Sequence, residues 1–275
     1  MRILLVNPVT GGDEKWPERV ETGRCAPDVI LYRTQVPFGP ESVETYTDES
    51  YAAVAVLETI VQHRGDFDAF VVGCFSDPGV WPAREVVREP VVGIGEAAML
   101  LACSLGRQFS LLGTVSRDVA VLAHLVERLG LKERLASIRP IDREVIQLRD
   151  AGVREQVLAD LTAVARAAIS EDHAEVLCPG CGGLAGFCEE LAQAIGVPVV
   201  DPVGAGIAWA EMQVRLRLSH SGRAMFAPAH PKDFGISPEM QAGCNPFRAV
   251  STLYRVRGGS PTERRAADEE DQKCE

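Results

Sequence analysis

Short runs of apolar residues alternate with longer amphipathic stretches over roughly the first 218 residues. An uninterrupted apolar run of four to eight residues is typical of a strand buried on both faces of a parallel sheet. The alternation therefore predicts an α/β protein with mostly parallel sheets flanked by helices. The predicted strands cover residues 2–6, 29–34, 69–72, 91–92, 109–112, 137–141, 175–178 and 199–200.

Two amphipathic stretches, residues 51–63 and 153–169, have apolar positions at helical spacing. The expected buried positions are Val54, Leu57 and Val61 in the first stretch and Val157, Leu161, Val164 and Ala168 in the second. Three glycines, Gly106, Gly130 and Gly196, follow helical stretches, where a residue in the left-handed conformation commonly ends a helix. We expect all three to be such helix ends.

An internal repeat of about a hundred residues defines the architecture more sharply. FVVGC, which ends at Cys74, is followed by PVVGIGEAA, and LCPGC, which ends at Cys181, is followed by PVVDPVGAG. An apolar run ends near Thr10 upstream of the first block and near Thr114 upstream of the second, so the threonines are 104 and the cysteines 107 residues apart. Because ligands of parallel α/β sheets bind outside the carboxyl ends of the strands, we expect these four residues to point into one cleft between two similar lobes.

The organisation changes after the repeat. Residues 1–218 are predicted to form the two-lobed unit, whereas residues 219–257 are rich in Pro, Gly and aromatic side chains and predict a loop-rich extension, packed onto the body or across a subunit boundary. Within it, STLYRVR at 251–257 predicts a short edge strand. Residues 258–275 are charged and non-aromatic, which is typical of a disordered tail.

Charge narrows the class of partner. The 39 acidic residues outnumber the 28 basic ones and give a formal net charge of −11, which argues against nucleic acid or an anionic membrane as the main partner. The sequence has no run of about 18 apolar residues that could cross a bilayer, and MRILLVNP is too short for a secretory signal. We therefore expect a cytoplasmic protein that acts on a small-molecule substrate. We also expect it to be a homo-oligomer.

Two of the eight cysteines stand out. Cys74 and Cys181 each follow a predicted strand at a Gly-containing turn before a helix, where backbone N–H groups and the positive helix terminus favour the thiolate. The alternative, a small buried apolar side chain, is favoured for Cys25, Cys103, Cys188 and Cys244, and Cys274 is expected to be an exposed thiol.

Other motifs give weaker indications. Cys178 and Cys181 form a CxxC pair, but a zinc site would need a second ligand pair, and a thioredoxin-like redox pair belongs after the first strand of a different fold. GIGEAA lacks the full GxGxxG spacing of a dinucleotide site. Arg84 and Glu85 are expected to begin a helix and to form structural ion pairs. No histidine has a supporting constellation: His63, His124, His173, His220 and His230.

Several motifs together resemble the hydantoin/allantoin racemase branch of the aspartate/glutamate racemase superfamily. They are CFSDPG with AREVVREPVVGIGEAAMLLA, FSLLGT, GCGGLAGF with VPVVDPVGAG, the opening VNPVT and the Ser42-Val43-Glu44 region with Asp48. The resemblance covers about residues 1–218. It implies two pseudo-symmetric α/β lobes and racemisation without a cofactor or metal. It also implies one catalytic cysteine per lobe, Cys74 and Cys181, acting on opposite faces of the substrate carbon.

The chemistry explains why two cysteines are needed. Inversion removes a proton from one face of the carbon and delivers one to the other, so a thiolate and a thiol must flank it. In a 5-substituted hydantoin, the resulting carbanion is delocalised into the adjacent carbonyl, whose oxygen hydrogen-bond donors would stabilise. Backbone groups of the strand-end loops and the Thr114 and Ser116 hydroxyls are the expected donors. The expected substrate-binding residues are Asn7, Val9, Thr10, Ser42, Phe75, Ser76, Gly113, Thr114, Gly182 and Gly183.

Two departures from the family pattern affect the substrate more than the reaction. Val9 stands where the family's NPNT motif has an amide, and Gly113 replaces the first hydroxyl of a TT pair. Three alternatives stay open: an amino-acid racemase, a maleate cis-trans isomerase, or a ligand-binding homologue that has lost turnover. Arylmalonate decarboxylases use a single cysteine, so the paired thiols disfavour that reaction.

Overall fold

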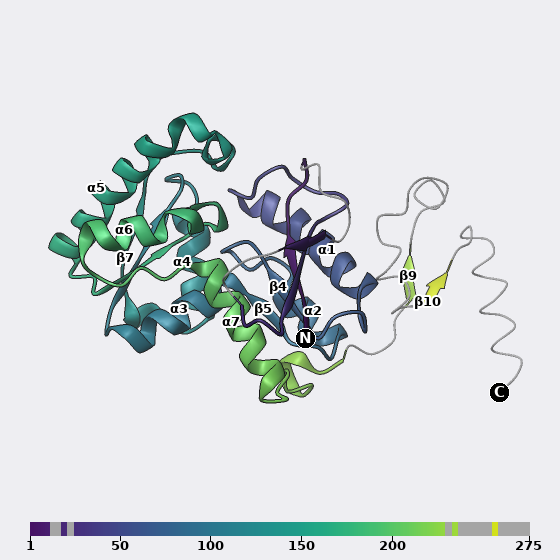
Figure 1. Cartoon of the computed structure of the whole chain (residues 1–275). Coiled ribbons are helices and arrows are strands. Elements are labelled where there is room, and N and C mark those ends of the chain that lie inside the picture. The colour runs from purple at the N-terminus through teal and green to yellow at the C-terminus, as the bar shows by residue number, and fades with distance from the viewer. Residues whose placement is uncertain (12–17, 21–24, 229–232, 236–254, 258–275) are drawn as a thin grey trace, which may run out of the picture.

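The computed structural model describes residues 1–11, 18–20, 25–228, 233–235 and 255–257. These residues form two α/β lobes, one purple to blue and the other teal to green in Figure 1. Each lobe has a central sheet whose principal strands are parallel, with helices packed around it. The predicted fold class is therefore confirmed.

The first lobe contains a five-stranded sheet in the order β2-β3-β1-β4-β5, in which only the edge strand β2 runs antiparallel to its neighbour. Its elements are β1 (Arg2–Asn7), β2 (Glu18–Val20), β3 (Ile30–Gln35), α1 (Tyr46–Gln62), β4 (Ala69–Val72), α2 (Val80–Val86), β5 (Val91–Gly93) and α3 (Ile94–Leu105). The neighbouring strands β1 and β4 consist almost entirely of buried apolar residues, as their uninterrupted apolar sequences predict.

The second lobe contains a parallel sheet in the order β7-β6-β8. Val199 extends it only by an isolated bridge to Leu177, where the sequence predicts a strand over 199–200. The elements are β6 (Phe109–Gly113), α4 (Val119–Arg128), η1 (Lys132–Arg134), β7 (Leu135–Pro140), η2 (Val145–Arg149), η3 (Ala151–Val153), α5 (Arg154–Asp172), β8 (Val176–Pro179), η4 (Gly182–Phe187), α6 (Cys188–Ile195) and α7 (Pro202–Arg215).

The two sheets share one topology. The order β3-β1-β4-β5 of the first lobe matches the order β7-β6-β8 of the second, with Val199 in the place of β5. The chain then continues into η5 (Ala224–Phe226), and β9 (Asp233–Gly235) pairs in parallel with β10 (Arg255–Arg257). β10 covers only the end of the predicted strand 251–257. The predicted tail at 258–275 lies outside the described residues.

Two helices join the lobes. α3 and α7 pack against each other at the centre of the molecule (Figure 1), α7 also packs on β4 and β5 of the first sheet, and α3 packs on β8 of the second. A Cβ on Gly206 would lie 2.8 Å from Cγ2 of Ile94, so the absence of a side chain at this glycine permits the close approach. The residues between the two sheets form one continuous apolar core.

The buried face of α1 differs from the sequence prediction. The helix begins five residues earlier than expected, at Tyr46, because Thr45 and Asp48 form a reciprocal capping box. Of the predicted positions, Val61 is buried and Leu57 is partly buried, but Val54 is exposed, and Ala52, Val56 and Ile60 are fully buried instead. α1 has apolar residues on more than one side. The face that packs on the sheet is the one that carries Ala52 and Ala55, whose small side chains allow a close approach. In α5 the predicted Val157, Leu161 and Ala168 are buried, while Ala165 is buried in preference to Val164.

The three predicted glycine helix ends have two different causes. Gly130 and Gly196 adopt the left-handed conformation, with φ of 71° and 75°, as expected. Gly106 also ends a helix, α3, as predicted, but it is extended at φ −156° and not left-handed. A Cβ there would lie 2.8 Å from Cγ2 of Val176 and 2.9 Å from Cβ of Glu175, so close packing against β8 requires this glycine.

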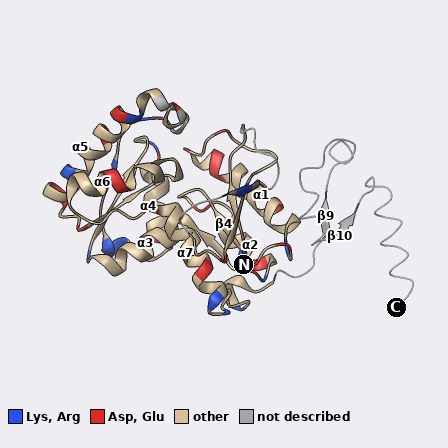
Figure 2. Cartoon of the chain, viewed as in Figure 1, with Lys and Arg blue, Asp and Glu red and all other residues tan. Residues whose placement is uncertain are grey.

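Basic and acidic positions are interspersed over both lobes in the view of Figure 2. Within the described part of the chain, no helix combines the length and apolar character needed to cross a membrane.

Candidate active site

A cavity of about 410 Å³ is lined by residues from the carboxyl ends of the central strands of both lobes. Parallel α/β sheets commonly bind ligands at this edge. Nine of the predicted site residues line it: Asn7, Val9, Cys74, Phe75, Ser76, Thr114, Cys181, Gly182 and Gly183. Both cysteines are therefore brought to one cavity from sequence positions 107 residues apart.

The two cysteine-bearing turns lie against each other. A Cβ on Gly182 would lie 2.9 Å from the carbonyl oxygen of Gly73, and a Cβ on Gly73 would lie 2.5 Å from Oδ1 of Asn7. Both distances are too short for a real Cβ contact, so a larger residue at position 182 would push the two turns apart, and one at position 73 would displace the Asn7 side chain. The glycines beside the two cysteines thus allow the lobes to close on one small cavity.

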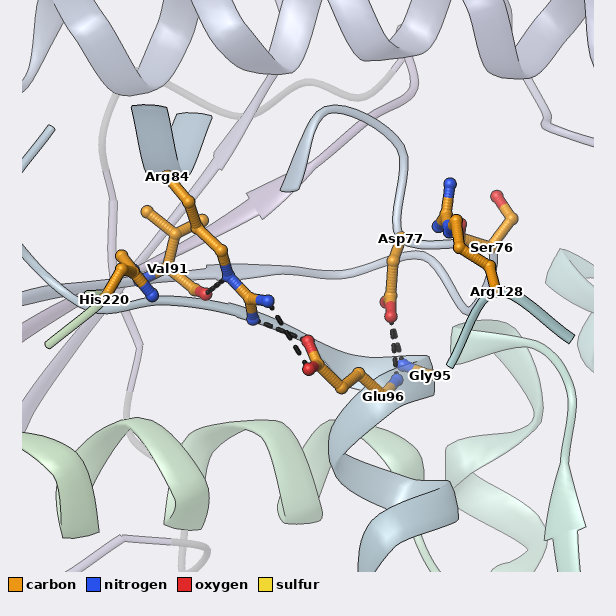
Figure 3. Close-up of polar contacts among 8 residues, drawn as sticks. All are labelled: Ser76, Asp77, Arg84, Val91, Gly95, Glu96, Arg128 and His220. Carbon is orange, nitrogen blue, oxygen red and sulfur yellow. Dashed lines mark hydrogen bonds and ion pairs between the residues drawn. The ribbon is translucent and has the colours of Figure 1, made fainter. Parts of the chain in front are cut away.

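Asp77 fixes the turn that carries Cys74 to the start of α3. The two carboxylate oxygens of Asp77 accept hydrogen bonds from the backbone N–H groups of Gly95 (2.9 Å) and Glu96 (2.7 Å) (Figure 3). A Cβ on Gly95 would lie 2.0 Å from the carbonyl oxygen of Phe75, and one on Gly93 would lie 2.1 Å from Cγ of Asp77. The glycines of GIGEAA therefore make room for the cysteine turn.

Arg84 has a structural role, as expected, but its placement differs from the prediction. α2 begins at Val80, so Arg84 lies in its last turn and not at its start, and the ion-pair partner of Arg84 is Glu96. Arg84 Nη2 lies 2.5 Å from Oε2 of Glu96, and its Nε donates to the carbonyl oxygen of Val91 at 3.0 Å (Figure 3). This pair connects α2, β5 and α3 beneath the Cys74 turn.

Cys181 lies at the N-terminus of η4, directly after β8. Its Sγ accepts a hydrogen bond from the backbone N–H of Gly183 at 3.4 Å. Sγ of Cys74 lies 3.5 Å from Oγ of Ser76. Each thiol therefore has one local polar neighbour that can stabilise its negative form.

Both thiols are nevertheless held in the protonated form, contrary to the sequence expectation. Burial raises the pKa of Cys74 to about 11 and that of Cys181 to about 12. The hydrogen bonds from Ser76 and Gly183 act in the opposite direction, but the loss of water solvation is the larger effect. The negative charge of Asp77 further raises the pKa of Cys74, and Asp118 does the same for Cys181.

Three predicted binding residues do not line the cavity. The hydroxyl of Thr10 donates to the carbonyl oxygens of Gly39 (3.3 Å) and Pro40 (3.4 Å), which fixes the loop. Ser42 precedes the segment that reaches the cavity, residues 43–45. Gly113 ends β6 behind the wall, where a Cβ would lie 2.8 Å from Oδ1 of Asp118.

The two hydroxyls predicted as substrate donors are committed to protein acceptors. Oγ1 of Thr114 donates to Oδ2 of Asp118 at 2.6 Å. Oγ of Ser116 donates to Oδ1 of Asp142, which is exposed. Of the predicted enolate donors, the backbone groups of the two cysteine turns therefore remain.

Sequence reasoning missed three charged residues of the cavity wall: Arg33, Glu44 and Asp118. Glu44 Oε1 accepts the backbone N–H of Val145 at 2.8 Å, which connects the first lobe to η2 of the second. Arg33 lies on β3 beside β1, and Asp118 follows Thr114 by four residues. The signal that could have identified Arg33 and Asp118 is their position at the end of a predicted strand or in the loop that follows one, and Glu44 lies in the Ser42-Val43-Glu44 region that carries the family resemblance.

The four other cysteines in the described part of the chain are packed, buried or half-buried side chains. Cys178 is buried in the core between the sheets and contacts the carbonyl oxygen of Ala98, so it does not face the cavity with Cys181. Cys188 is buried and contacts Leu184, and Cys25 and Cys103 are half-buried. No group of three potential metal-ligating His, Cys, Asp or Glu side chains occurs among the described residues. Cys244, Cys274 and His230 lie outside them.

The fold and the cavity are those of a two-lobed α/β enzyme. Sequence comparison identifies the family to which this enzyme belongs. Residues 14–210 match the model of the Asp/Glu/hydantoin racemase family, and the chain belongs to this family. It is accordingly a racemase, an isomerase.

Its relatives include hydantoin and allantoin racemases. Hydantoin racemase of Pseudomonas sp. (strain NS671) is 34% identical over 221 residues, which cover 78% of this chain and 87% of that protein. The allantoin racemase of Pseudomonas fluorescens superposes with a TM-score of 0.78 at 33% identity, covering 86% of this chain and 100% of the other. The allantoin racemase of Klebsiella pneumoniae gives 0.76 at 30% identity, covering 88% and 98%.

Proposed function

We propose that the protein racemises 5-substituted hydantoins, or closely related cyclic ureides, by a two-cysteine proton transfer that needs no cofactor. The observation that carries the proposal is that Cys74 and Cys181, one from each lobe, line the same cavity on two turns that lie against each other. The relatedness to hydantoin and allantoin racemases supports the same substrate class.

The reaction needs one thiolate and one thiol. The thiolate takes the proton from C5 and becomes a thiol, and the electron pair delocalises into the adjacent carbonyl as an enolate. The opposite thiol then protonates C5 on its other face and becomes the thiolate, so the two cysteines exchange protonation states in each turnover. Ser76 beside Cys74 and the N–H of Gly183 beside Cys181 stabilise whichever sulfur carries the charge.

The raised pKa of each thiol has two opposing consequences for this chemistry. Less thiolate is present near pH 7, but the thiolate that forms is a stronger base. A strong base suits a carbon acid, which gives up its proton less readily than an oxygen or nitrogen acid. The buried setting is therefore consistent with proton abstraction from carbon.

The charged side chains of the cavity wall favour a substrate with a neutral ring over a substrate with two carboxylates. Among the described residues, the wall carries the carboxylates of Glu44 and Asp118 and the guanidinium of Arg33. A substrate with two carboxylates, such as maleate or glutamate, would bring two negative charges beside two others in a partly dry cavity. A hydantoin ring brings none.

The test is polarimetry or circular dichroism on enantiopure 5-substituted hydantoins, allantoin, aspartate and glutamate, with Cys74→Ser and Cys181→Ser beside the wild type. We expect the wild type to racemise the hydantoins and each variant to be at least ~100-fold slower, the low end for positioned acid–base groups. Cys103→Ser, at a half-buried position outside the cavity wall, is the matched control and should retain activity.

Solvent deuterium separates the two faces. Each single cysteine variant is expected to retain exchange at C5 of one enantiomer while failing to invert it. Full racemisation by either variant would refute the two-base assignment. A wild-type protein that binds hydantoins without turnover would favour the ligand-binding alternative, and turnover of aspartate or glutamate alone would make it an amino-acid racemase.

A further inference from the structure

The short helix η2 brings two apolar side chains to the wall of the active-site cavity. In a 3₁₀-helix, residues three apart lie above one another on the same face. Val145 and Leu148 have this spacing, and both line the cavity. Ile146, between them in the sequence, is 42% exposed and is not part of the wall. One face of η2 therefore forms cavity wall, and another meets solvent.

Leu148 is partly buried and lies beside Cys181 in the wall. Cδ1 of Leu148 and Sγ of Cys181 each lie 3.6 Å from the same point, the position that a Cβ on Gly183 would take. The glycine thus leaves the space between the leucine and the sulfur free of a side chain. The N–H of Val145 donates to Oε1 of Glu44 at 2.8 Å and holds the start of η2 against the first lobe. Leu148 is therefore held in place next to one of the two reacting thiols.

The side chains around the two cysteines differ in polarity. The hydroxyl of Ser76 lies 3.5 Å from the sulfur of Cys74, and the amide of Asn7 is part of the same wall. The side chain beside the sulfur of Cys181 is the apolar Leu148. A polar ring needs hydrogen-bond partners, whereas an apolar group gains free energy when it leaves water for an apolar surface. The ring of a hydantoin is such a polar part, and an alkyl or aryl 5-substituent is such an apolar part.

The stereochemistry of C5 determines when the substituent reaches Leu148. The hydrogen and the substituent on C5 lie on opposite faces of the ring. When the hydrogen faces Cys74, the substituent leans toward Cys181 and hence toward Leu148. After inversion the hydrogen faces Cys181, and the substituent leans toward the first lobe. The leucine is therefore placed to contact the substituent of one enantiomer more than that of the other.

We propose that Leu148 is a specificity-determining residue that packs against an apolar 5-substituent in the enantiomer whose C5 hydrogen faces Cys74. The inference rests on the proposed function and deepens it, because it names hydantoins with branched aliphatic or aromatic 5-substituents as the substrate class. A charged or strongly polar substituent is disfavoured at this place, since the side chain of Leu148 offers it no hydrogen-bond partner.

The first test compares two substituents. Leu148→Ala removes most of the apolar contact, so kcat/KM for 5-isobutylhydantoin should fall at least ~10-fold relative to kcat/KM for 5-methylhydantoin, the low end for a missing methylene in an apolar pocket. A change in the hydration of Cys181 would affect both substrates alike, so the ratio isolates the contact with the substituent. The matched control is Ile146→Ala, on the same helix but outside the wall, which should leave the ratio unchanged.

The second test compares the two enantiomers of 5-isobutylhydantoin. The enantiomer that Cys181→Ser still exchanges with solvent deuterium is the one whose C5 hydrogen faces Cys74. We expect Leu148→Ala to raise the KM for this enantiomer at least about fourfold more than the KM for the other, the equivalent of one buried CH₂ group. Because enantiomers have equal free energy in solution, kcat/KM must stay equal for the two, and kcat should therefore shift by the same ratio.

An unchanged ratio between the two substrates in Leu148→Ala would overturn the inference. So would a KM change that is equal for the two enantiomers or larger for the other one. If Leu148→Ala does not fold, Leu148→Val is the second variant, and the substrate ratio should fall in the same direction by a smaller factor. Wild-type turnover of hydantoins without these changes in the variants refutes the inference alone. Absence of wild-type turnover on every hydantoin refutes the proposed function and the inference with it.

Discussion

At the scale of single residues, the two cysteines are alike in position but differ in their surroundings. Cys74 has the Ser76 hydroxyl beside its sulfur and Asp77 behind it, whereas Cys181 has the N–H of Gly183 and the carboxylate of Asp118. Burial raises both pKa values, to about 11 for Cys74 and about 12 for Cys181, so both sulfurs are mainly protonated near pH 7 in the free protein.

The pKa of about 11 predicts the direction of the pH dependence. A thiol becomes charged when it loses its proton, so below its pKa the reactive fraction rises about tenfold per pH unit. We expect the rate of Cys74 alkylation by iodoacetamide, followed by mass spectrometry, and the background-corrected kcat/KM to rise in this way between pH 7 and 9. A plateau in both quantities over this range would contradict a pKa near 11.

Val9 gives a second prediction at this scale, because it lines the cavity where the family motif has an amide. An apolar side chain cannot pair a polar substituent, and an unpaired buried polar group costs roughly 1–3 kcal/mol. We expect weak activity on allantoin relative to hydantoins with apolar 5-substituents, and a shift of ~10–100-fold toward allantoin in Val9→Asn. If Val9 only packs beneath the loop, the substitution will lower the melting temperature and leave the ratio of kcat/KM values unchanged.

At the scale of elements, the start of α3 and the Cys74 turn are fitted to each other. Gly93 and Gly95 have no side chain where Asp77 and Phe75 approach, and Asp77 returns two hydrogen bonds to the helix. Burial raises the pKa of Asp77 to about 7, so this cap carries a cost that its N–H bonds only partly offset. The cysteine is thus positioned by a helix that begins 20 residues later in the chain.

Replacement of Gly95 tests this fit. A Cβ 2.0 Å from the Phe75 carbonyl oxygen would meet backbone, which cannot move aside without shifting the cysteine turn. We expect Gly95→Ala to lower the free energy of unfolding by at least about 1–3 kcal/mol, the range for overpacked sites, and to reduce kcat. Gly186→Ala in η4 is the control, since its Cβ would meet nothing within 4 Å. Equal melting temperatures for the two variants would show that the turn is not held this way.

At the scale of the whole molecule, the segment after α7 returns to the first lobe. Ser219 donates a hydrogen bond to the carbonyl oxygen of Arg88, between α2 and β5, and Nε2 of His220 accepts the backbone N–H of Val91 in β5 at 2.8 Å. Phe226 then packs against Trp81, and the Arg84 guanidinium lies over its ring. Figure 3 places His220 beside Val91 and Arg84, on the network that leads to Glu96. The segment therefore braces the lobe that carries Cys74.

This contact predicts an acid-sensitive stability. Burial lowers the pKa of His220 to about 4, with the positive charge of Arg84 as a smaller cause, so the folded protein holds the imidazole neutral. Between pH 6.5 and 4 the unfolded chain binds a proton that the folded one does not, and stability is lost as pH falls through this window.

The measurement is the melting temperature of the wild type and His220→Ala from pH 7 to 4. We expect the variant to be less stable at pH 7, because Val91 loses its acceptor, and the difference to shrink toward pH 4. His124→Ala, at an exposed position of α4, is the control. A difference that is constant with pH would mean that His220 contributes packing alone.

The sequence by itself determined the α/β class, the order of the strands along the chain and the placement of Cys74 and Cys181 on equivalent turns. These features depend on local patterns: uninterrupted apolar runs, turn glycines, and a repeat that copies one folding unit. The same local patterns gave wrong predictions where more than one arrangement of the residues was compatible with them. α1 has apolar residues on more than one side, and only packing on the sheet exposed Val54 and buried Ala52 and Ile60.

The tertiary structure alone decided how the site is built between the lobes. Whether Thr10 faces the cavity, what Gly106 and Gly113 leave room for, and which carboxylates join the wall depend on chain segments far apart in sequence. The protonation of the thiols was decided in the same way. A turn before a helix favours the thiolate locally, but closure of two lobes over the turn removes water from the sulfur, and desolvation is the larger effect.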